Sequence, residues 1–154
     1  MTFMSLEDAL FEEVGVILKD MQTDTADGKH EVSFKGYKHE LPMLLSSEAD
    51  EEELFPCYII RIAEGETQDD NDCWHVAADI ILCVHDQEAG GHRHILIAIQ
   101  RIVDRFAEMP AMKAFRADQD IKWQAGEEDS YPYYYGAVTI TFSVPKIQRR
   151  FEYV

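Results

Sequence analysis

Residues 73–85 alternate between two kinds of side chain for thirteen positions without a break. This strict period of two predicts one β-strand with a core face and a second, half-polar face. At ~3.3 Å per residue the strand spans roughly 43 Å, well beyond the usual ~17–20 Å. Such a strand outreaches its own domain unless a bulge bends it, so we expect part of it to contact another molecule. The core face holds Trp74, Val76, Ala78, Ile80, Leu82 and Val84, and the other face holds Cys73, His75, Ala77, Asp79, Ile81, Cys83 and His85.

Two other segments have helical spacing. From about residue 5 to 22 apolar residues recur every three or four positions, and Ser5 followed by Asp8 resembles a capping box. The second segment covers residues 92–109 and ends at Pro110, which cannot continue a helix. Both segments therefore predict amphipathic helices with one apolar face.

Shorter patterns predict the remaining elements. Strands are expected at about 31–37, at 56–62 and at 131–144. Met112, Phe115 and Ile121 suggest a short turn that precedes a strand through Trp123. The order is therefore helix, strands, helix, strands. This segregation favours an α+β fold in a single domain, residues 1–154, with a mostly antiparallel sheet and two amphipathic helices packed on one face.

Helices on one face leave the other face of the sheet open. The side chains expected there are partly apolar and partly small and polar, and such a face on a small acidic protein suggests self-association. The possible subunit-interface residues on it are Asp79, Ile81, Thr139 and Thr141, with Ala77 and Tyr135 beside them.

The segment 145–154 is a possible docking arm. It is the locally basic part of the chain and carries apolar residues among its basic ones. In a homo-oligomer, such an arm could lie on the acidic loops of a neighbour and fix the register of the contact. The alternative is a terminus held by its own subunit. The arm residues we assign to the possible interface are Ile147, Arg149, Arg150 and Phe151.

The chain is strongly acidic, with a formal net charge of −16 from 30 acidic and 14 basic residues. Such a surface repels phosphate backbones and anionic membranes, so we expect no tight nucleic-acid binding and no membrane partner. No apolar run approaches the ~20 residues of a membrane span, and the acidic N-terminal residues do not resemble a signal peptide. We therefore expect a protein made and retained in a cytoplasm. Solubility alone is the simpler explanation of the charge.

Candidate chemical sites are weak. Cysteine and histidine at alternate strand positions could each offer two metal ligands, but the pairs Cys73/His75 and Cys83/His85 lie roughly 33 Å apart along an extended strand. Cys83 and His85 could still join His92 or His94 across the Gly90–Gly91 turn. The alternative is satisfied or exposed histidines, and we expect no metal and no cofactor. Three cysteines are too few for a disulfide framework, and Cys57 resembles a small core residue.

No catalytic motif stands out, and we expect no enzymatic activity. Asp79 could in principle act as a base near His75, but a solvated or interface carboxylate fits the pattern better. Gly90–Gly91 before a helix lacks the further glycines and the lysine of a phosphate-binding loop.

The layout of the chain resembles the tail terminator (tail completion, minor tail protein) families of long-tailed bacteriophages and prophages. The resemblance covers roughly residues 5–145 and lies in the order of the elements. They are the N-terminal helix, the strand opening at Phe55-Pro56-Cys57-Tyr58-Ile59-Ile60, the long strand Trp74–Leu82, the helix Ile95–Ile102 running to Pro110, and the final strand Gly136–Phe142.

This resemblance implies a structural role without catalysis. Such proteins form a ring, usually hexameric, on the end of the tail tube, stop its polymerisation and present the surface that joins the head. It implies a homo-oligomer in the virion tail, assembled in the host cytoplasm, with tail tube and head–tail connector proteins as partners. Acidic residues commonly line the DNA passage of these rings. The candidate lumen-facing acids are Glu64, Glu66, Asp69, Asp70, Asp72, Glu127, Glu128 and Asp129.

Two other functions remain open at the level of the sequence. One is an acidic binding module, such as an inhibitor that mimics nucleic acid with its carboxylates. The other is a small metal-binding enzyme that uses Cys83, His85, His92 and His94.

Overall fold

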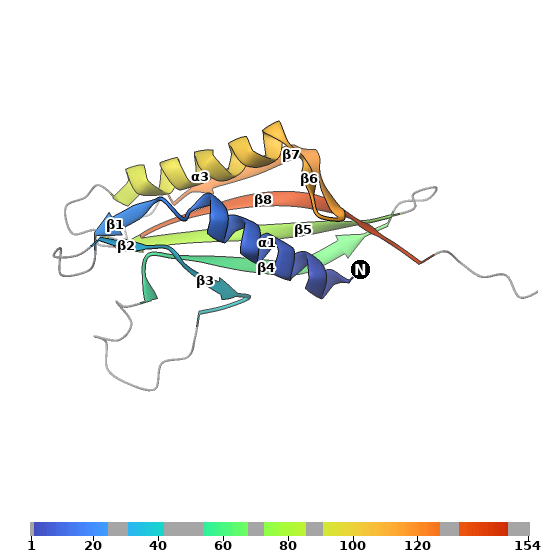
Figure 1. Ribbon diagram of the computed structural model, residues 1–154, viewed down its shortest axis with the longest axis horizontal. Coiled ribbons are helices and arrows are strands. Elements are labelled where there is room, and N and C mark those ends of the chain that lie inside the picture. Colours follow the sequence, from blue (N-terminus) through green and yellow to red (C-terminus); the bar gives the residue numbers. More distant parts are fainter. Residues whose placement is uncertain are drawn as a thin grey trace, which may run out of the picture.

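A computed structural model describes residues 2–24, 31–41, 54–67, 73–85, 91–126 and 133–147. Within these ranges the chain forms two helices, a six-stranded sheet and a separate two-stranded hairpin (Figure 1). The elements are α1 (Phe3–Ile17), β1 (Gln22–Asp24), β2 (Glu31–Ser33), β3 (Lys35–Lys38), β4 (Cys57–Glu66), β5 (Cys73–His85), α3 (Gly91–Glu108), β6 (Ala111–Met112), β7 (Phe115–Ala125) and β8 (Tyr133–Pro145).

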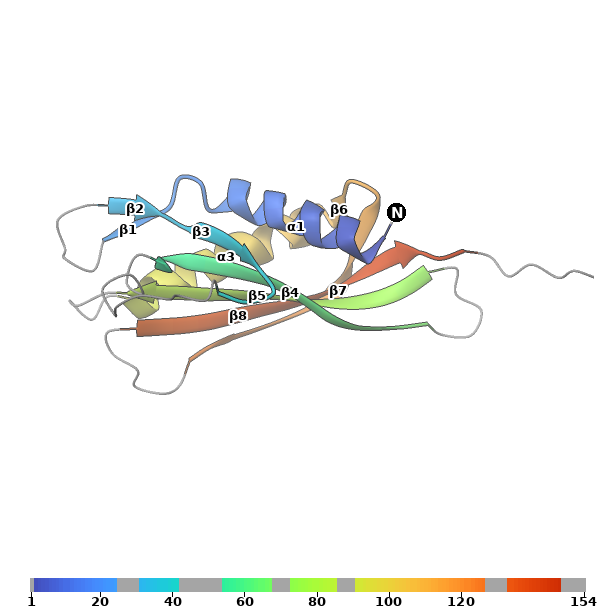
Figure 2. The same cartoon turned by 90° about the horizontal axis from the view of Figure 1, so that it is seen from below.

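The six strands lie in the order β3-β4-β5-β8-β7-β6. β3 pairs with β4 in parallel, and the other neighbours in this sheet are antiparallel. Figure 2 shows that α1 and α3 lie on the same side of the sheet. The predicted α+β fold, with a mostly antiparallel sheet and two helices on one face, is therefore confirmed.

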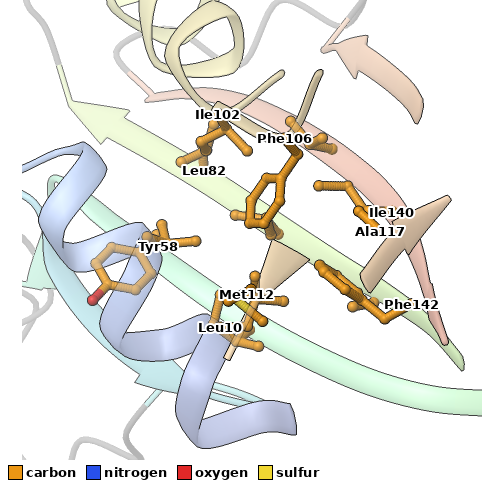
Figure 3. Close-up of a cluster of buried hydrophobic side chains, with 14 of the residues drawn as sticks. Leu10, Tyr58, Leu82, Ile102, Phe106, Met112, Ala117, Ile140 and Phe142 are labelled. Atoms are coloured by element: carbon orange, nitrogen blue, oxygen red, sulfur yellow. The ribbon is translucent and has the colours of Figure 1, made fainter. Parts of the chain in front are cut away.

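The central strand is β5, which has the bounds that its alternation predicts. β8 pairs with it along its whole length, from Cys73 opposite Pro145 to His85 opposite Tyr133. The helix-facing side of these strands forms the main core together with the apolar faces of α1 and α3, part of which Figure 3 shows. Its fully buried residues include Leu6, Leu10, Val14, Ile80, Leu82, Ile95, Ile102, Phe106, Ile140 and Phe142.

The first helix differs from its predicted bounds of about 5 to 22. Thr2 caps it: the backbone N–H of Ser5 donates to the Thr2 hydroxyl at 3.0 Å, and the Ser5 hydroxyl accepts from the Thr2 backbone. The helix ends at Ile17, although Leu18 and Met21 are buried beyond it. Their apolar spacing therefore arose from core burial in the turn after the helix, which periodicity alone cannot distinguish from another helical turn.

Two strands are longer than predicted because irregular pairing obscures their alternation. β4 continues past Ile62 to Glu66, with a register shift between Ile62 and Glu64 that leaves Ala63 as an extra residue. β7 begins at Phe115, where we predicted a turn, and its pairing with β8 shifts between Ala117 and Ile121. A bulge moves the following side chains to the other face, so a strict period of two fails across it.

The core prediction concerns Phe142, which is fully buried and meets Phe106 edge to face with ring centroids 5.5 Å apart. Replacing it by alanine removes the ring contact and leaves a cavity, so Phe142→Ala should lower the free energy of unfolding by about 3–5 kcal/mol. Urea denaturation measures this. The exposed Leu96 is the control, and Leu96→Ala should change stability by less than about 0.5 kcal/mol. Equal effects of the two substitutions would contradict the assigned core.

Candidate functional site

The face of the sheet turned away from the helices carries a row of polar side chains. Arg61, Asp79, Thr139 and Lys122 are successive register partners on β4, β5, β8 and β7. The Thr139 hydroxyl donates to Asp79 Oδ1 at 2.7 Å. The Arg61 guanidinium donates instead to the carbonyl of His39. The Asp79 carboxylate is thus held by a threonine across the strand pair, which favours a structural or interface role over that of a base.

Two shallow hollows lie on this face and bring the predicted interface residues of the sheet together. The first has a volume of about 320 Å³, and its lining includes Asp79, Ile81 and Thr139. The second has a volume of about 260 Å³ and is lined by Glu64, Gly65, Glu66, His75, Ala77 and Thr141. All four predicted residues, Asp79, Ile81, Thr139 and Thr141, are partly exposed.

One end of this face is not open, which corrects the expectation drawn from the sequence. A second, smaller core covers it, centred on Phe55, Cys57 and Cys83. Ile81, which we placed on the open face, packs against this cluster. The remaining partly buried members are Tyr37, Leu41, Leu54 and Tyr133. The uncovered part of the face therefore lies toward Ala77 and Thr141, at the opposite end of β5.

Two thiols meet inside the smaller core. Cys57 and Cys83 are register partners on β4 and β5, both thiols are buried, and no disulfide joins them. The pKa of the Cys57 thiol is raised above its ordinary value, first by the hydrogen bond with Cys83 and then by burial. Cys57 is therefore a protonated core residue, which agrees with its interpretation as a small apolar side chain.

The candidate metal ligands do not come together among the described residues, where no group of three His, Cys, Asp or Glu side chains is placed to hold a metal ion. Cys83 pairs with Cys57 instead. His85 is buried with its ring 4.9 Å from that of Tyr133, and its Nδ1 has no hydrogen-bond partner in the described part of the chain. His92 is exposed at the start of α3. At Cys73, the sulfur lies 3.9 Å from His75 Nε2.

Gly91 has a packing role rather than a phosphate-binding one. It is buried at the start of α3, where a side-chain carbon would overlap the ring of Tyr134. A residue without Cβ lets the helix begin this close to β8.

Most of the predicted lumen acids and arm residues lie outside the described ranges. These are Asp69, Asp70, Asp72, Glu127, Glu128 and Asp129 among the acids, and Arg149, Arg150 and Phe151 in the arm. The described ones are exposed: Glu64 and Glu66 near the end of β4, and Ile147 just after β8.

An apolar groove beside the N-terminus of α1 is the feature that sequence reasoning missed. Phe3 and Trp74 meet edge to face with ring centroids 5.7 Å apart, and Phe3 remains 47% exposed. Two adjoining hollows of about 230 and 500 Å³ share these two side chains. We call this the Phe3–Trp74 groove. Its other lining residues are Thr2, Ile62, Ala63, Glu64, Gly65, Val76, Val144, Pro145, Lys146 and Ile147. Recognising Thr2 as the cap would have placed Phe3 on the helix, but it would not have placed Phe3 beside Trp74.

The three thiols should differ in reactivity, because Cys57 and Cys83 are buried and Cys73 is partly exposed. In the native protein we expect a thiol reagent such as Ellman's reagent to modify Cys73 alone, and all three cysteines only after denaturation. Peptide mapping of the modified sites measures this. Cys73→Ser is the matched control and should abolish the native reaction. Rapid modification of Cys57 in the folded protein would contradict the buried pair.

Comparisons with known proteins do not identify a family. No family model matches the chain, and no curated protein is significantly similar to it in sequence. Neither of the described helices is long and apolar enough to span a membrane.

Proposed function

We propose that this protein is a structural subunit of a bacteriophage or prophage tail, which caps the tail tube as an oligomeric ring and forms the surface that joins the head. It works by shape and charge, without catalysis. The support is the order of elements that resembles tail terminator proteins, together with a sheet of which the described residues leave one part of one face uncovered.

The uncovered part of the sheet face carries the proposal. The helices bury the core side of β5 and β8, and the smaller core covers one end of the opposite side. At the other end, Ala77 and Thr141 lie beside a hollow with Glu64, Glu66 and His75 on its walls. Half-apolar surface of this kind is typical of a contact with another protein subunit.

The acidic surface gives the ring a way to pass DNA. A wall of carboxylates repels the phosphate backbone, so the DNA slides through and does not adhere. Glu64 and Glu66, both exposed, are the described candidates for such a wall. The other predicted lumen acids, at residues 69–72 and 127–129, lie outside the described residues. The ring would contact tail tube and connector proteins.

An acidic inhibitor of a basic protein is the second candidate, and the net charge of −16 is the observation that favours it. Such an inhibitor acts as a monomer whose carboxylates bind a basic partner, and its capture weakens steeply with salt. A monomeric protein that retains a basic host protein at low salt would support this candidate over the ring.

Self-association through the uncovered face is the testable consequence. Sedimentation velocity over a wide range of concentrations should show wild-type protein forming an oligomer. Thr141→Arg places a bulky charge in the contact, so it should raise the dissociation constant at least ten-fold, equivalent to about 1.4 kcal/mol. Leu96→Arg, on the exposed side of α3, is the control and should associate as the wild type does. A chain that stays monomeric at high concentration, with or without tail tube protein, would overturn the proposal.

A further inference from the structure

Among the described residues, only half of the outer edge of β4 is paired with another strand. β3 pairs with β4 as far as Lys38 opposite Ile60, and the N–H of His39 then donates to the Ile60 carbonyl at 2.7 Å. From Ile62 to Glu66, β4 pairs with β5 on its inner side, and no strand in the described ranges pairs with its outer side. An edge with unpaired backbone N–H and C=O groups is a template for one more strand.

The two sides of this free edge differ in chemistry. On the helix side lies the Phe3–Trp74 groove, which includes Ile62 in its lining. On the other side, Glu64 and Glu66 are opposite Ala77 and His75, whose side chains point away from the helices. Because Ala63 is an extra residue in β4, Ile62 and Glu64 are opposite the adjacent residues Ala78 and Ala77 and so lie on opposite faces of the sheet. A strand added here therefore needs apolar side chains on one side and basic ones on the other.

The segment 146–154 has this two-sided pattern. Read as a strand, it places Ile147, Phe151 and Tyr153 on one side. The other side carries Lys146 and Arg150, with Gln148 and Glu152 between and after them. Arg149 is the exception, since it falls among the apolar residues. The segment begins at the rim of the groove, which Lys146 and Ile147 help to line, and Ile147 is 94% exposed there.

We propose that the segment 146–154 of a second copy of this chain adds to the free edge of β4 as an extra strand. Its apolar side enters the Phe3–Trp74 groove, and its basic side meets Glu64 and Glu66. This inference rests on the proposed ring and names one of its subunit contacts. In this contact Glu64 and Glu66 lie against a neighbour, so the acids that face the DNA are the other predicted ones, Asp69, Asp70, Asp72, Glu127, Glu128 and Asp129. Because a segment on one copy binds an edge on the next, the contact is heterologous and can close a ring.

The path of the chain favours a second copy over the segment's own subunit. β4 and β8 run in the same direction, since each is antiparallel to β5, which lies between them. To reach the outer edge of β4, the segment of the same copy must cross three strand spacings, about 14 Å, and approach around the end of β5. Lys146 and Ile147 of the same copy line the end of the groove beside Val144. About four further residues would be used in that crossing, which leaves about three to pair along the edge. A neighbouring copy needs no such crossing.

Complementary charge reversal tests this contact in the full-length protein. The first variant, Glu64→Lys with Glu66→Lys, carries a basic edge and a basic segment. The second, Lys146→Glu with Arg150→Glu, carries an acidic edge and an acidic segment. Each alone should dissociate, with a dissociation constant raised at least ten-fold in sedimentation velocity. An equimolar mixture should regain association, because each segment then finds an edge of opposite charge on the other variant.

Two controls make the outcome specific. Asp104→Lys with Glu108→Lys changes the net charge by the same amount at an exposed part of α3 and should leave association unchanged. Circular dichroism and the melting temperature verify that each variant folds. A mixture that stays dissociated would overturn the docking in trans. If the wild type associates and both reversal variants associate equally well, this contact is wrong, but the proposed ring still stands. A strictly monomeric wild type would overturn both.

Discussion

The pairing of β5 with β4 on one side and β8 on the other is the constraint on which the rest of the structure depends. Both partners follow β5 over most of its thirteen residues, so one strand fixes the register of the sheet. Its alternation sends Val76, Ala78, Ile80 and Leu82 into the core beneath the helices. A slip of one residue would turn every one of these side chains to the other face. The helices, the smaller core and the uncovered hollows are all positioned by this register.

The elements that sequence reasoning predicted well are those with a long, uninterrupted period. β5 has its predicted bounds, and α3 and β8 lie within one or two residues of theirs. The errors lie where local chemistry or a bulge overrides the period. α1 begins earlier than predicted because the Thr2 hydroxyl caps it. β4 and β7 are longer than predicted because the extra residue at Ala63 and the register shift after Ala117 interrupt their alternation.

The candidate site was harder to predict, because it depends on contacts between distant parts of the chain. The alternation of the two strands predicted that Asp79 and Thr139 lie on the same face of the sheet, and the structure adds the hydrogen bond between them. The cover over the end of that face could not be foreseen, since it joins the segment around Phe55 to the far end of β5. The groove between Phe3 and Trp74 likewise joins residues seventy-one positions apart, which no local pattern connects.

The open hollow, the groove and the outer edge of β4 are all surfaces that the described residues of one subunit do not cover. All three gather at the end of the sheet where Glu64 and Glu66 lie. A protein that acts alone has little reason to keep an unpaired edge beside an apolar groove. Their position at one end is the physical basis for proposing that the sheet works as part of a ring.

Native mass spectrometry of the purified wild-type protein tests this central claim most directly. A closed ring made by a heterologous contact predicts one discrete oligomer with no continuous series of larger assemblies. Raising the ionic strength before measurement should shift that species toward the monomer, because charge pairs contribute to the contact. A single monomer peak at every concentration and ionic strength would contradict the account.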